Sequence, residues 1–216
     1  PSQLQANGLD ETEGAALAES QNYLQVSCHI EDADLPVRGL PPAAEAAAEA
    51  VAGVANGWIH DPQTGRYYAR ADWNQSRLAQ SRFEPRRSIR VLRERSEDGH
   101  YWLGTRGLIA FGKPDLELFP VDDPEVEPLA EQLLVLADLL ISEQTVGPGA
   151  RLTVGPVEAL LVPRDAFAAT LPPETAGKGI ETAGPTVAPR LAVVDPDGRV
   201  GDMASHQAFL RRLQVR

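Results

Sequence analysis

The stretch from Asp98 to Pro120, DGHYWLGTRGLIAFGKPDLELFP, constrains the fold of this chain more than any other. It predicts two strands, over 100–110 and 116–119, joined by a tight turn at Gly112-Lys113-Pro114-Asp115. Glycine permits the positive φ of such a turn, and proline presets its own φ. A further strand over 88–95 precedes them across Ser96-Glu97-Asp98-Gly99, which is typical of a hairpin connection. The segment therefore predicts consecutive antiparallel strands.

Two helices flank this segment. Pro41-Pro42 opens an alanine-rich helix that ends before Asn56-Gly57, with a predicted buried stripe of Ala44, Ala47, Val51 and Val54. A leucine-rich helix is predicted from Asp123-Pro124 to Ile141. Shorter β-prone or turn-bounded runs predict strands over 23–30, 58–60, 66–69, 151–154, 157–162 and 191–194, and Phe209, Leu210 and Leu213 predict the apolar side of a final helix.

The order of these elements predicts an α+β fold, with a mainly antiparallel sheet covered on one face by two helices. A ferredoxin-like variant is the nearest named architecture. The domain plan has a polar flexible lead over 1–20 and an α+β domain over 21–162. A Pro/Gly-rich extension with a short C-terminal helix, over 163–216, is expected to pack on the same domain. Because the chain starts at Pro1, it is expected to be either a chain that has lost its initiator or a piece of a longer one.

Composition excludes several classes of protein. The net charge of −11 opposes association with nucleic acid and with anionic membranes. No apolar run approaches the roughly 20 residues of a membrane helix, and the N-terminus lacks a secretory signal. The single cysteine, Cys28, cannot form an internal disulfide, so a reducing cytoplasm is expected. Arginine outnumbers lysine 18 to 2, which indicates a GC-rich bacterial genome.

The motif Gly107-Leu108-x-x-Phe111-Gly112-x-Pro114-Asp115-Leu116-Glu117 resembles a hairpin signature of bacterial domain families of unknown function. The neighbouring order is also similar to theirs, with Trp58-Ile59-x-Asp61 after the first helix and Leu152-Thr153-Val154-Gly155 after the second. The resemblance covers roughly 23–162. It implies, through some relatives, a role in interbacterial conflict or as an immunity-type binding protein, and it supplies no catalytic residue.

Motifs for catalysis, metal ions and phosphate are absent from the sequence. The four histidines (His29, His60, His100 and His206) form no ligand spacing, and Cys28 and His29 would point to opposite faces of a strand. There is no Gly-x-Ser-x-Gly elbow and no Gly-rich phosphate loop. We therefore expect no catalytic residue, no metal and no cofactor.

One polar constellation admits a functional interpretation: His60, Asp61, Arg106, Asp115 and Glu117 would gather at one sheet edge if their strands are neighbours. An arginine between carboxylates could orient a polar ligand, and the histidine could titrate near neutral pH. In the alternative interpretation the two aspartates cap their turns, and Arg106 pairs with Glu117 across strands. The alternative is favoured because structural ion pairs outnumber active sites among such clusters.

A second feature is basic. The segment 77–95 holds seven arginines, including Arg86 and Arg90, against two glutamates. It predicts either a docking surface for an acidic protein partner, or a solvated basic strand whose charges balance the acidic remainder of the chain. Aromatic residues concentrate between Trp58 and Trp102 and could form either an interface or a core.

These features favour a non-catalytic binding or interaction domain with a possible protein partner, neither nucleic acid nor membrane, and a monomeric or homodimeric state. The alternative is a small-molecule enzyme with a His/Arg/carboxylate site at a sheet edge. It requires a concave pocket where at least one histidine and one carboxylate converge.

Overall fold

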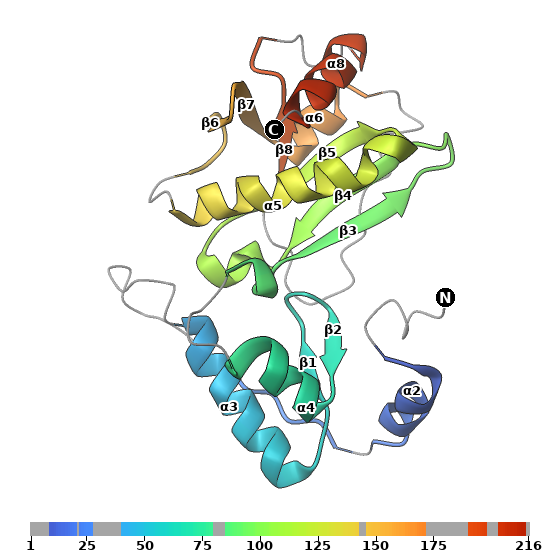
Figure 1. Cartoon of the computed structure of the whole chain (residues 1–216), viewed down its shortest axis with the longest axis vertical. Helices are drawn as coiled ribbons and strands as arrows, with labels where there is room; N and C mark the ends of the chain where they lie inside the picture. Colours follow the sequence, from blue (N-terminus) through green and yellow to red (C-terminus); the bar gives the residue numbers. More distant parts are fainter. Residues whose placement is uncertain are drawn as a thin grey trace. The chain divides into compact units, whose positions relative to one another are not determined.

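The computed structural model describes residues 9–20, 22–27, 40–79, 85–142, 146–171, 190–197 and 203–214 (Figure 1). The chain forms two compact units. Unit 1 is Pro1–Arg87 with Ala183–Pro185, and unit 2 is Ser88–Thr182 with Thr186–Arg216. The boundary between Arg87 and Ser88 falls inside the range 21–162, which the sequence predicts as one domain.

In the described residues, unit 1 is built from helices and one small hairpin. Strands β1 (Ile59–Asp61) and β2 (Arg66–Tyr68) pair antiparallel across the predicted turn. No strand forms at 22–27, where one was expected, and residues 28–30 of that expected strand lie outside the described residues. The helical elements are α2 (Glu11–Ala18, inside the expected flexible lead), α3 (Leu40–Ala55), α4 (Arg70–Trp73), the π-helical turn η2 (Asn74–Leu78) and the 3-10 turn η3 (Pro85–Ser88).

Helix α3 packs through a different face from the predicted one. Ala52 is buried and joins Ile59 and Trp73 in a small core, with Ala48 at its margin. Val54, expected in the buried stripe, is 92% exposed. The buried face of α3 differs from the predicted one because Glu45, which is only 7% exposed, makes its contacts inside unit 1. The physical reason lies in a tertiary ion pair, described below, which the local apolar pattern does not contain.

Unit 2 contains a six-stranded sheet in the order β3-β4-β5-β8-β7-β6. Neighbours pair antiparallel except β5 and β8, which are parallel. The prediction of an α+β fold is confirmed, whereas the ferredoxin-like variant is wrong because the sheet is mixed and six-stranded. The strands are β3 (Arg90–Arg95), β4 (Tyr101–Arg106), β5 (Asp115–Val121), β6 (Arg151–Val154), β7 (Val157–Pro163) and β8 (Arg190–Val194).

The helical elements of unit 2 are η4 (Leu108–Phe111), η5 (Asp123–Glu125), α5 (Val126–Ser142), α6 (Arg164–Ala168) and α8 (Met203–Leu213). Helix α5 lies across β3, β4 and β5 (Figure 1). Helix α3, the other helix expected over this sheet, belongs to unit 1. The predicted stripes are confirmed: Leu129, Leu133, Leu136 and Leu140 of α5, and Phe209, Leu210 and Leu213 of α8, are all buried.

A second apolar cluster lies under α6. Trp102 stacks on Phe119 with ring centroids 4.1 Å apart, and Phe167 of α6 packs with them. Because successive strand residues point to opposite faces, Leu103 and Leu118 point away from this cluster. Among the helices in the described ranges, none is both long and apolar enough to cross a membrane.

Candidate functional site

The surface of unit 1 has a shallow depression of about 280 Å³, formed where β2, α4 and η2 meet. This volume is slightly below the roughly 300 Å³ at which small-molecule pockets begin. The tyrosines of the lining are half-buried, whereas its arginine, aspartate and glutamine are exposed. The lining residues are Arg66, Tyr67, Tyr68, Asp72, Gln75 and Ser76.

The wall from α4 and η2 has an unusual backbone. The N–H of Ala79 donates to the carbonyl of Asn74, five residues earlier, at 2.7 Å. The hydroxyl of Ser76 donates to the carbonyl of Asp72 at 2.6 Å. Single π-helical turns of this kind occur often at functional sites. Here the turn presents Gln75 to solvent while Arg77, two residues later, has a side chain only 3% exposed.

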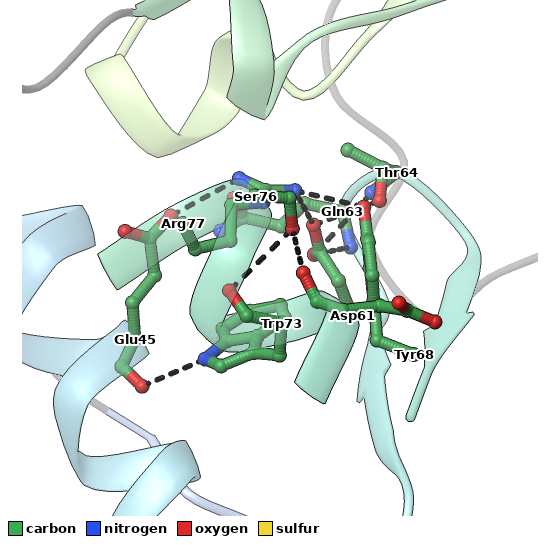
Figure 2. A network of polar contacts seen from close by, with 9 residues as sticks. Glu45, Asp61, Gln63, Thr64, Tyr68, Trp73, Ser76 and Arg77 are labelled. Atoms are coloured by element: carbon green, nitrogen blue, oxygen red, sulfur yellow. Dashed lines mark hydrogen bonds and ion pairs between the residues drawn. The ribbon is translucent and has the colours of Figure 1, made fainter. Parts of the chain in front are cut away.

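Arg77 fixes this wall from inside (Figure 2). Its guanidinium lies 3.0 Å from the carboxylates of both Glu45 and Asp61, and it donates to the hydroxyl of Tyr68 at 3.2 Å. The same group lies over the rings of Tyr68 and Trp73, at 5.6 and 5.3 Å from their centroids. One guanidinium offers five donors in a fixed plane, so a single residue connects α3, β1 and β2.

Three further hydrogen bonds belong to this polar network (Figure 2). The indole N–H of Trp73 donates to the backbone carbonyl of Glu45 at 3.1 Å. Asp61 accepts from the N–H of Gln63 at 2.9 Å and from the hydroxyl of Thr64 at 2.7 Å. Asp61 therefore caps the hairpin turn while it pairs with Arg77, which agrees with the alternative interpretation of this residue.

His60 lies beside the depression. Its ring stacks on Tyr67, the residue opposite it in β2, with centroids 4.3 Å apart and planes 20° from parallel. Alternation along the strands places this pair on the face away from Ile59 and Tyr68. The stack presents one aromatic surface of two half-buried rings next to the depression.

Asp115, in unit 2, closes the turn that the sequence motif encodes. Its carboxylate accepts from the hydroxyl of Thr105 at 3.1 Å and from the N–H of Leu108 at 3.2 Å. The same hydroxyl accepts from the N–H of Leu116 at 2.8 Å. Burial raises the pKa of Asp115 to about 6, despite these hydrogen bonds. The residue is only 5% exposed, so this titration takes place inside the fold.

Glu117 pairs with two arginines from the C-terminal part of the chain. Its carboxylate lies 3.2 Å from Arg164 and in short contact with Arg190, and its side chain is 1% exposed. Burial raises the pKa of Glu117, and the positive charge of Arg190 opposes that rise. The strand register places Gly104 opposite Glu117 and Arg90 opposite Arg106, so the cross-strand pair expected between Arg106 and Glu117 does not form in this register.

The structure divides the expected constellation between the units. His60 and Asp61 belong to unit 1, and Arg106, Asp115 and Glu117 belong to unit 2. Of the two arginines expected to dock a partner, Arg86 is exposed on η3 and Arg90 is half-buried in β3.

Sequence reasoning missed the partners of Glu117 and the central role of Arg77. Arg164 and Arg190 lie 47 and 73 residues from Glu117 along the chain, and no local pattern connects them. The described residues contain no group of three or more His, Cys, Asp or Glu side chains that could hold a metal ion. In comparisons with known proteins, no protein-family model, curated protein or solved structure matches this chain.

Proposed function

We propose that this protein is a non-catalytic binding domain, and that the depression of unit 1 is its contact surface for a protein partner. The observation that carries the proposal is the lining of that depression, which combines Tyr67 and Tyr68 with the polar residues Arg66, Asp72 and Gln75. Tyrosine and arginine are enriched at protein interfaces, because each combines a large contact area with hydrogen-bonding groups.

The rigidity of the surface also supports this proposal. Tyr68 accepts a hydrogen bond from Arg77, and the ring of Tyr67 stacks on that of His60, so contacts within unit 1 restrain both rings. A surface that is ordered before binding loses less conformational entropy on association. The small volume favours a side chain or a short segment of a partner over an enclosed metabolite.

The test compares the native chain with the double variant Tyr67→Ala/Gln75→Ala. Proteins captured from a lysate are purified, and their affinity for both chains is measured by calorimetry. We expect the double variant to bind at least tenfold more weakly, since two central contacts are lost. The matched control is Arg151→Ala/Glu158→Ala, which removes an exposed ion pair of unit 2. Equal affinity of the native chain and the Tyr67/Gln75 variant would contradict the proposed surface.

The same test also examines the alternative that an acidic partner docks on Arg86 and Arg90. The variant Arg86→Glu/Arg90→Glu reverses two charges and should weaken such a partner strongly at low salt and less at high salt. A partner lost only with this variant would move the contact surface away from the depression.

The second candidate function is a small-molecule enzyme. The observation in its favour is the carboxyl of Asp115, whose pKa burial raises to about 6, in the range suited to proton transfer; because the side chain is only 5% exposed, this candidate also requires a local opening that admits a substrate. A metabolite screen by thermal shift, repeated on Asp115→Asn, tests it. A ligand that raises the melting temperature of the native chain, and is turned over only by that chain, would support catalysis.

We further propose, on the sequence motif, that the chain is related to the bacterial families of unknown function that it resembles. Composition supports a cytoplasmic location without nucleic-acid or membrane partners. We propose a monomer or a homodimer, which light scattering coupled to size exclusion distinguishes directly.

A further inference from the structure

Helix α8 attaches to unit 2 through an apolar face with an ionic rim. Phe209, Leu210 and Leu213 are buried to 1% exposure or less. At the rim, Arg211 lies 3.3 Å from Glu125 of η5, and Arg212 lies 2.9 Å from Asp195 at the end of β8. Both arginines are more than half exposed, so these pairs add little to the attachment. The apolar face therefore holds the helix.

One titratable side chain lies inside this apolar face. His206 is 7% exposed, and its ring centroid lies 5.5 Å from that of Phe167 on α6 and 5.9 Å from that of Phe209. Its Nε2 atom has no hydrogen-bond partner among the described residues. The ring also hydrogen-bonds to the backbone of Phe119, so this bond belongs to Nδ1. A carbonyl oxygen can only accept, and the neutral ring therefore carries its proton on Nδ1.

The charged groups around the ring of His206 do not favour its protonation. The charged groups of the neighbouring elements are held in ion pairs: Asp195 with Arg212, Glu125 with Arg211, and Glu117 with both Arg164 and Arg190. Among these groups only Asp195 acts electrostatically on His206, and its carboxylate already accepts from Arg212 and from the N–H of Asp197. Burial lowers the pKa of His206, and the contributions of Phe119 and Asp195 do not reverse this effect.

We propose that α8 is an acid-released latch, in which protonation of His206 at Nε2 detaches the helix from unit 2. The added proton would create an N–H group directed at apolar surroundings, and a buried donor without an acceptor destabilises the closed state. In the detached state the imidazolium is hydrated and the penalty disappears. Detachment would uncover apolar surface that includes Phe167 and Phe209, independently of the contact surface on unit 1.

The linkage between protonation and opening sets the size of the effect. In the closed state the pKa of His206 is lowered, and in the open state it takes its ordinary value of about 6.5. Below about pH 6.5 the open state therefore binds more protons. Its population rises by up to about tenfold for each pH unit until the closed-state pKa is reached.

Hydrogen exchange measured by mass spectrometry tests the latch in the whole chain. Exchange of α8 amides is compared with that of α5 amides between pH 7.5 and 5, after correction for the intrinsic pH dependence of exchange. The test variant is His206→Asn, which keeps a donor near the position of Nδ1 and cannot titrate. The matched control is His100→Asn, since His100 is a half-exposed histidine of the same unit, paired with Asp122.

We expect α8 to lose at least fivefold of its protection relative to α5 on acidification. The loss should persist in His100→Asn and disappear in His206→Asn. Equal losses in α8 and α5, no loss in α8, or an unchanged loss in His206→Asn would each overturn the proposal. If His206→Asn does not fold, NMR titration of the native imidazole decides, because a pKa of 6.5 or above for His206 would also overturn it.

Discussion

Gly107 has a φ of +117°, and a Cβ atom placed on it would overlap the carbonyl oxygen of Ser88. Its neighbours in the sequence motif have equally specific positions. Leu108 is fully buried and donates its N–H to Asp115, and Gly112 has a φ of +65°. At the residue scale, the sequence motif from Gly107 to Glu117 thus encodes a 3-10 turn between two strands, and these residues have structural roles in unit 2.

The substitution Gly107→Ala should lower the free energy of unfolding of unit 2 by about 3 kcal/mol, because it adds a steric clash to an unfavourable φ. Gly99→Ala is the matched control, since Gly99 also has a positive φ, of +92°, but no atom lies within 4 Å of the place that the added methyl group would take. The control should lose about 1 kcal/mol. Urea unfolding followed by far-UV circular dichroism measures both, and equal losses would show that the contact with Ser88 is relaxed.

Asp115 makes the stability of unit 2 depend on pH. Its pKa is raised from 3.8 in the unfolded chain to about 6 in the fold, so the folded state binds more protons between these values. Its contribution therefore destabilises unit 2 as the pH rises from about 4 to 6, by on the order of 3 kcal/mol. The lowered pKa of His206 acts in the opposite direction below about pH 6.5.

Asp115→Asn should remove the first of these two dependences. Denaturant unfolding at pH 4, 5, 6 and 7 is compared for the native chain and the variant. The free energies of unfolding of the native chain and of Asp115→Asn should differ most at pH 7 and least at pH 4. A difference that is constant over this range would mean that Asp115 titrates at its ordinary pKa in the folded protein.

At the scale of elements, prediction from sequence succeeded where the information is local. The apolar stripes of α5 and α8 follow helical periodicity, and the hairpin turn at 96–99 closes with a hydrogen bond of 2.8 Å from Ser96 to His100. It failed for α3, where all candidate faces are rich in alanine, so hydrophobicity barely distinguishes them. The choice of face follows from Glu45 and its bond to Arg77, a residue 32 positions later.

Helix α3 offers a direct test of which face is buried. Ala52→Leu adds volume at a position that is 5% exposed and should lower stability by about 2 kcal/mol through overpacking. Val54→Leu makes a smaller increase at a position that is 92% exposed and should change stability by less than about 0.5 kcal/mol. Thermal unfolding monitored by circular dichroism at 222 nm measures both. A larger loss of stability in Val54→Leu than in Ala52→Leu would support the buried face that the sequence predicts.

At the scale of the whole molecule, the two units have cores of different size. The small core of unit 1 is centred on Ala52, Ile59 and Trp73, whereas unit 2 has a six-stranded sheet with several buried helices. No Pro/Gly-rich linker marks the boundary at Arg87, so the sequence predicts one domain for both. The candidate site is predictable only in part, since the sequence predicts that the aromatic residues between Trp58 and Trp102 form either an interface or a core, and the position of Tyr67 and Tyr68 beside η2 depends on tertiary contacts.

Two units with separate cores should unfold in two calorimetric transitions. Arg77→Met leaves the carboxylates of Glu45 and Asp61 without their buried cation, and should destabilise the transition of unit 1 by about 3–5 kcal/mol. The transition of unit 2 should not move. Arg70→Met, which removes a half-exposed ion pair with Glu49, is the control and should shift the transition of unit 1 much less, because solvent screens that pair. One cooperative transition, shifted as a whole by Arg77→Met, would contradict independent units.

The position of β8 also has a consequence for biosynthesis. This strand pairs with both β5 and β7, yet it is the last strand of the sheet to leave the ribosome. Until it is translated, the nascent chain carries β5 and β7 with unsatisfied pairing edges, which are the features that recruit chaperones or promote aggregation. A premature stop codon after α6 would therefore remove the middle of the sheet and not merely its tail. Nonsense variants in this stretch should yield insoluble protein although most of the strands have already been made.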